Sequence, residues 1–95
     1  MDRIYIGSNG RAAAINTQTG EIIWEVKFKN SSKEVSIVEK ENFLFVGCQG
    51  KFYCLNKQDG QTIWVNELKG WGYENIGIAM EGISVQYQTK IIDRS

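Results

Sequence analysis

The sequence has no histidine and no proline, and only two of its 95 residues are cysteines. Without histidine, the usual general base, the commonest zinc ligand and any Ser-His triad are missing. Eleven basic residues balance eleven acidic ones, so no net charge favours nucleic acid or an anionic membrane. The apolar runs are far shorter than the roughly 20 residues that span a bilayer. We therefore expect no nucleic acid and no membrane among the partners.

The two cysteines, Cys48 and Cys54, are too few for a disulfide framework. No histidine or further cysteine is present to complete a zinc site with them. We interpret both as buried, reduced thiols that act as small hydrophobes. Reduced thiols are typical of the cytosol, and the residues after Met1 do not form a secretory signal. A cytoplasmic location is the resulting expectation.

An internal repeat with a period of 40 residues runs through the chain. Without any gap, residues 4–11 align with 44–51, and residues 16–24 align with 56–64. The identical pairs include Gly7/Gly47, Gly10/Gly50, Asn16/Asn56, Gln18/Gln58, Gly20/Gly60, Ile23/Ile63 and Trp24/Trp64. This period is found in four-stranded propeller blades and in some helical repeats.

The residue types favour strands over helices. The apolar segments are short, rich in β-branched and aromatic residues, and bounded by glycine. Asn9-Gly10 is a strong signal for a two-residue hairpin turn, and Gln49-Gly50 stands at the same place in the second repeat. Gly20 and Gly60 end longer turns that need a left-handed conformation. The expected strands cover residues 4–7, 11–15, 21–27, 34–39, 42–48, 51–55, 61–66, 75–80 and 83–87.

A hairpin turn at Gln49-Gly50 fixes which side chains share a face. One face would hold Leu44, Val46, Tyr53 and Leu55, and the other Phe43, Phe45, Phe52 and Cys54. Because both faces are apolar, we expect the sheet to be covered on both sides. The same register separates Cys48 from Cys54, which disfavours a disulfide between them.

These patterns predict an all-β fold of antiparallel four-stranded propeller blades. Residues 1–95 would form a single partial β-propeller domain, with repeat 1 at about 4–43, repeat 2 at about 44–83 and a remnant at 84–95. The chain therefore supplies about two blades.

The segments Asn16–Trp24 and Asn56–Trp64 resemble the tryptophan-docking motif of the PQQ-like (pyrroloquinoline-quinone-like) β-propeller repeats, the family of quinoprotein alcohol dehydrogenases. Residues Ile4–Gly10 resemble the same family's apolar-Tyr-apolar-Gly-Ser-x-x-Gly strand. The resemblance implies that the tryptophan of each repeat packs against the neighbouring blade. The implied docking residues are Trp24, Trp64, Gly20 and Gly60.

In the quinone-dependent members of this family, the cofactor sits above a calcium ion beside a catalytic Asp and a disulfide between adjacent cysteines. Cys48 and Cys54 are not adjacent, and no acidic residue stands in a matching motif. We therefore expect no catalytic residue, no metal and no cofactor, and hence no enzyme. A non-catalytic protein-interaction scaffold is the leading hypothesis. The alternatives are a carbohydrate-binding, lectin-like propeller and a fragment of a quinoprotein dehydrogenase.

The loop at residues 69–75 is the candidate ligand-binding loop. Its glycines and aromatic rings could stack on a sugar or a peptide, and its candidate residues are Trp71, Tyr73 and Asn75. The other interpretation is that Trp71 and Tyr73 cap the interface between blades.

Two blades leave an uncovered surface at each end, because repeat units bury their faces against their neighbours. The chain could belong to a larger propeller, remain an open pair of sheets, or assemble with itself. Full members of the family have six to eight blades, so self-assembly would be a head-to-tail trimer or tetramer. In that arrangement the strand expected at 76–80 would complete the first blade of the next copy.

Overall fold

The computed structural model describes residues 2–28, 34–72 and 76–81, and all of its regular structure is β. The strands are β1 (Arg3–Ser8), β2 (Arg11–Asn16), β3 (Ile22–Lys27), β4 (Val35–Lys40), β5 (Phe43–Cys48), β6 (Lys51–Asn56) and β7 (Thr62–Asn66). Each lies within one or two residues of its expected bounds. The all-β prediction is therefore confirmed.

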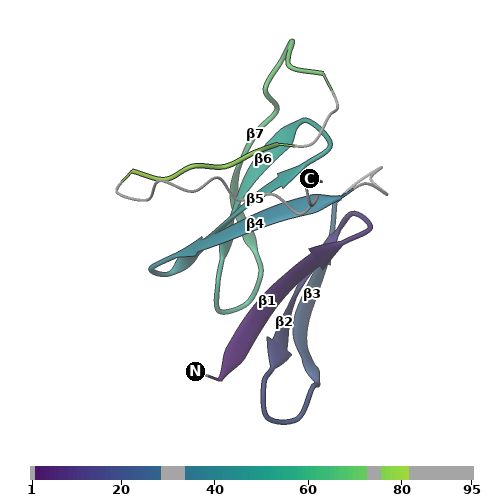
Figure 1. Cartoon of the computed structure of the whole chain (residues 1–95), viewed down its shortest axis with the longest axis vertical. Helices are drawn as coiled ribbons and strands as arrows, with labels where there is room; N and C mark the ends of the chain where they lie inside the picture. The colour runs from purple at the N-terminus through teal and green to yellow at the C-terminus, as the bar shows by residue number, and fades with distance from the viewer. Residues whose placement is uncertain (1, 29–33, 73–75, 82–95) are drawn as a thin grey trace, which may run out of the picture.

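The seven strands form two antiparallel sheets, which Figure 1 shows as separate groups. The first sheet has the order β1-β2-β3, and the second has the order β4-β5-β6-β7. Within each sheet, every strand pairs with its neighbour in sequence, as in the blades of a propeller. Equivalent strands of the two repeats thus occupy equivalent places.

The turns follow the glycines of the repeat. Asn9 and Gly10 have φ of 52° and 73°, and Gln49 and Gly50 have φ of 50° and 79°. Positive φ at both central residues is the mark of a type I′ turn, whose twist suits a two-residue hairpin. Gly20 and Gly60, at φ of 80° and 78°, take up the left-handed conformation that the sequence predicted.

Each sheet has two faces with different side chains, which we name by their contents. The tryptophan face carries Tyr5, Ala14 and Trp24 in the first sheet, and Phe45, Cys54 and Trp64 in the second. The aliphatic face carries Ile4, Ile6 and Ile15 in the first sheet, and Leu44, Val46 and Leu55 in the second. The predicted register of β5 and β6 is confirmed, including Phe45 opposite Cys54.

The core lies where the tryptophan face of the first sheet packs on the aliphatic face of the second. Leu44, Val46 and Leu55 are fully buried there. Phe28, which follows β3, packs on Tyr53 with ring centroids 4.5 Å apart. Gly7 of β1 lets the two sheets come close together, because a Cβ at this position would lie 2.7 Å from the Val35 side chain of β4. We call this packing of the first sheet on the second the junction.

Residues 76–81 lie over the tryptophan face of the second sheet. A Cβ on Gly47 would lie 2.8 Å from Ile76, and Figure 1 shows this green segment running across the second sheet. Gly7 and Gly47 are equivalent in the repeat, so Ile76 contacts the second sheet as Val35 of β4 contacts the first. The expected strand at 75–80 is nevertheless wrong for the described residues, which form only an isolated bridge at Ile78. Gly77 and Ala79 explain this, because both residue types disfavour strands.

The strand expected at 83–87 and the remnant at 84–95 lie outside the described residues. In the part of the chain that the structure covers, no helix is long and apolar enough to cross a membrane.

Candidate interaction site

The side chain of Trp24 fastens the two sheets together at the edge of the junction. Its indole Nε1 donates a hydrogen bond to the Lys57 carbonyl at 3.0 Å. Its ring lies over Gly60, where an added Cβ would come within 2.5 Å of the indole. Tyr5 packs beside it, with ring centroids 6.1 Å apart. A glycine is therefore required at position 60 both for its positive φ and for the tryptophan that covers it.

The turn that receives Trp24 is held by its own hydrogen bonds. The Asn56 side-chain oxygen accepts the Gln58 N–H at 2.8 Å, and the Gly60 N–H donates to the Asn56 carbonyl at 2.7 Å. Asparagine often closes a turn in this way. The turn thus presents its backbone to the indole as a rigid surface.

Arg3 adds a contact to the same turn. One guanidinium nitrogen donates to the carbonyl oxygens of Lys57 and Gln58, at 3.3 and 3.1 Å. The Lys57 ammonium lies 2.6 Å from the Glu39 carboxylate. Sequence reasoning missed this group of residues, because position 43, the repeat equivalent of Arg3, is a phenylalanine.

Trp64, the equivalent of Trp24, has a different environment. Its ring packs on Phe45 and Phe52, with centroids 6.2 and 5.9 Å away, yet 44% of the residue is exposed. The described residues offer Trp64 no glycine turn of the kind that covers Trp24. Gly20, the equivalent of Gly60, would have nothing within 4 Å of an added Cβ. Trp24 and the turn that ends at Gly60 therefore contact each other, whereas Trp64 is partly exposed and the turn that ends at Gly20 is uncovered.

The strand that carries Trp64 is an exposed edge. All five residues of β7 are exposed, and the outer side of β7 has no neighbouring strand within the described ranges. An open hollow of about 880 Å³ follows the end of this strand, lined by residues 64–69. An unpaired strand edge beside a hollow can accept an extended peptide through main-chain hydrogen bonds.

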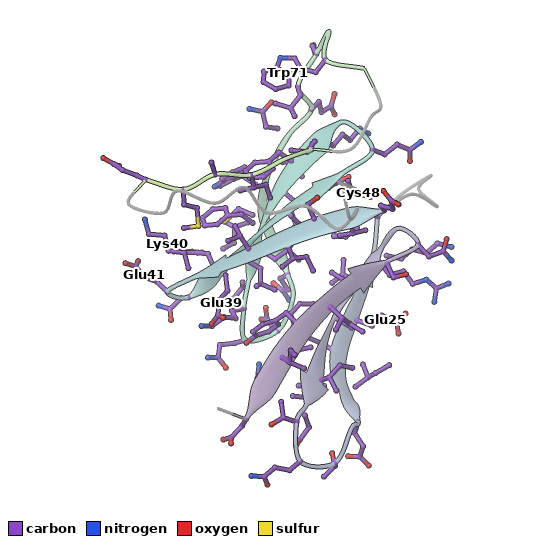
Figure 2. The ribbon with its side chains drawn as sticks, viewed as in Figure 1. Glu25, Glu39, Lys40, Glu41, Cys48 and Trp71 are labelled. Carbon is purple, nitrogen blue, oxygen red and sulfur yellow. The ribbon has the colours of Figure 1, made fainter. Side chains whose placement is uncertain are left out.

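The candidate ligand-binding loop continues from β7. Trp71 is 72% exposed, and Figure 2 shows it at the end of the molecule farthest from the first sheet. Its N–H donates to the Leu68 carbonyl at 3.0 Å, which shapes the turn around Gly70. A second hollow, of about 540 Å³, lies beside this turn and reaches Lys51. Tyr73 and Asn75, the other two predicted loop residues, lie outside the described residues.

The family model described as "Outer membrane protein assembly factor BamB" matches residues 8–90 of the chain. The chain belongs to this family of PQQ-like repeats. The resemblance seen in the Asn-to-Trp segments is thereby confirmed. No curated protein matches the chain.

Both cysteines of this PQQ-like repeat chain are buried, and neither forms a disulfide in the described part of the chain. Cys48 lies on the aliphatic face of the second sheet and Cys54 on its tryptophan face. The strand register shows this, because Cys48 is opposite Lys51 and Cys54 is opposite Phe45, as predicted. Burial raises the pKa of the Cys54 thiol above its ordinary value. A raised thiol pKa keeps the sulfur protonated and unreactive at neutral pH.

Tyr53, on the aliphatic face, has a perturbed hydroxyl. Burial raises the pKa of Tyr53 above its ordinary value, and the nearby Cys48 and Glu67 raise it further. The neutral phenol is therefore the stable form inside the junction. Within the described ranges, no group of three or more histidine, cysteine, aspartate or glutamate side chains is placed to hold a metal ion.

Proposed function

We propose that this PQQ-like repeat chain is a non-catalytic module that binds protein partners and acts as a scaffold. The observation that carries the proposal is the exposed apolar surface on β7 and the loop after it. Ile63, Trp64 and Val65 are each about half exposed, and Trp71 is 72% exposed. Trp64 lies on the tryptophan face and Val65, opposite Tyr53, on the aliphatic face, so exposed apolar side chains line both sides of this strand edge. Clusters of large exposed apolar side chains are typical of protein-interaction surfaces.

Two further features support a binding role. The family is described as an assembly factor for outer-membrane proteins. The second sheet also ends in an unpaired strand edge beside two hollows, a geometry that suits an added strand from a partner.

The test is to select binders from a random peptide display library and to measure their affinity by fluorescence polarisation. We expect Trp71→Ala and Val65→Lys each to weaken binding about tenfold or more, as removal of an interface hot-spot residue does. Glu25→Gln is the matched control, because Figure 2 shows Glu25 on the first sheet, away from Trp71. Binders that are unaffected by both substitutions would contradict the proposal, as would a library that yields none.

Carbohydrate binding is the second candidate, and it is supported by the exposed ring of Trp71, which stands between two glycines, Gly70 and Gly72, that line the second hollow. Sugars stack their apolar faces on aromatic rings. Here a sugar would lie between the ring of Trp71 and the glycine-rich turn. A glycan array separates the two functions. Binding of a defined oligosaccharide that is lost in Trp71→Ala would favour the sugar, and a blank array would eliminate it.

We also propose a cytosolic location, because both thiols are reduced and buried. The family's description points instead to the assembly of outer-membrane proteins. Fractionation of cells that express the tagged chain tests this, and recovery of the chain outside the cytosol would reject it.

A further inference from the structure

The junction inside the chain shows what a tryptophan and a glycine turn do when they meet. Trp24 lies on Gly60, donates to the Lys57 carbonyl and closes the edge of a buried apolar interface. The second repeat carries the same tryptophan and the first repeat carries the same turn. The chain therefore carries both partners of a second contact of this kind. Trp64 lies on the second sheet and the Asn16–Gly20 turn on the first, so the two do not meet within one molecule.

The exposed turn already has the shape of the occupied one. Its closing hydrogen bond, from the Gly20 N–H to the Asn16 carbonyl, is 2.7 Å long, the same as in the turn that ends at Gly60. The φ angles of the two glycines differ by only 2° (80° against 78°). The space over Gly20 is open. A tryptophan could therefore be received there without rearrangement.

The faces beside these two elements are also complementary. Ile4 and Ile6, on the aliphatic face of the first sheet, are 52% and 47% exposed, whereas the equivalent Leu44 and Val46 are fully buried in the junction. On the other sheet, Trp64 rests on Phe45 and Phe52 with much of its ring uncovered. An aliphatic face and a tryptophan face are the two surfaces that pack together inside the chain.

The segment at 76–81 is compatible with such a contact. It covers Gly47 as β4 covers Gly7, and Trp64 on the same face is still 44% exposed.

We propose that a second copy of this chain docks head-to-tail on the first, with Trp64 of one copy seated on the Asn16–Gly20 turn of the next. The contact joins different surfaces of the two copies, so it repeats until it closes into a ring. If each copy adds its two described sheets, a ring of the six or eight sheets that the resemblance implies holds three or four copies. The contact uses Trp64 and Gly20, whereas the peptide-binding test above uses Trp71 and Val65, so the two proposals can fail separately.

Light scattering after size exclusion tests the proposal over a range of concentrations of the full chain. The wild type is expected at three or four times its 10.8 kDa mass. Trp64→Ala removes the inserted ring, and Gly20→Asn fills the space over the turn with a residue that tolerates positive φ. Each variant is expected to associate about thirtyfold or more weakly than the wild type, as loss of a hot-spot residue does. Urea unfolding of both variants checks that they remain folded.

Mixing the two variants provides the decisive control. The Gly20→Asn copy keeps its tryptophan, and the Trp64→Ala copy keeps its open turn, so one contact can form and no more. The equimolar mixture is expected to give a dimer of one copy of each, while each variant alone stays monomeric. A monomeric wild type, an assembly that survives in Trp64→Ala, or a mixture without heterodimer would overturn the proposal.

Discussion

The two repeats have nearly the same sequence motif but different degrees of burial. Leu44 and Val46 are fully buried, whereas Ile4 and Ile6, at the same places one repeat earlier, are about half exposed. Gly60 is covered by an indole, and Gly20 is open. The comparison teaches that a residue of the repeat contributes to stability only when a neighbouring unit covers it. Equivalent strands are buried where two units pack together and exposed at the end of the array.

The largest expected difference between the repeats concerns the aliphatic faces. Leu44→Ala should lower the free energy of unfolding by about 2–5 kcal/mol, because it opens a cavity in a fully buried site. Ile4→Ala, at the equivalent place, should cost less than about 1 kcal/mol, since half of that side chain is already in water. Urea unfolding of the two variants in dilute protein measures both costs. Equal losses would mean that the junction is not where the core lies.

The next largest difference concerns the two glycine turns. Gly60→Asn and Gly20→Asn place the same side chain at nearly the same positive φ, so the backbone cost cancels between them. Only at position 60 would the new Cβ meet Trp24, and overpacking of this kind costs about 1–3 kcal/mol. In protein dilute enough to be monomeric, we expect Gly60→Asn to unfold at a lower urea concentration than Gly20→Asn. Indistinguishable midpoints would argue against the seating of Trp24 on this turn.

The smallest expected effect is a loss of stability at alkaline pH, and it arises from the second sheet alone. The pKa values of Tyr53 and Cys54 are both raised by burial above their ordinary values of 10.0 and 9.0. A raised folded-state pKa gives stability that is complete below the unfolded value and is lost as pH rises through the folded value. Stability should therefore decline above about pH 9. Tyr53→Phe should remove the part of this decline that lies above about pH 10, as measured by urea unfolding at a series of pH values, and an unchanged pH profile would contradict the assignment.

The turns were the most predictable part of the fold, because their conformation is imposed by a few local residues. Asn9-Gly10 needs no distant partner to take positive φ, and neither does Gly20. The pairing of strands then follows from short turns and alternating apolar residues. Sequence and structure agree here for that reason.

Contacts between the sheets were less predictable, because they depend on which units are neighbours. The Arg3 contact with the Lys57 and Gln58 carbonyls leaves no mark in the repeat, since one partner is backbone. The repeat also makes Trp24 and Trp64 look alike, and only the three-dimensional arrangement shows that one is covered and the other partly exposed. The motif therefore located the candidate residues without distinguishing their environments.

The pairing of sequence neighbours within each sheet has a consequence for how the chain reaches its native state. Each ladder closes over a turn of a few residues, so little loop entropy is lost before its hydrogen bonds form. Such local topologies are associated with fast folding. The contacts that join distant parts of the sequence are concentrated in the packing of one sheet on the other, so cooperativity between the two repeats depends on that single layer of side chains.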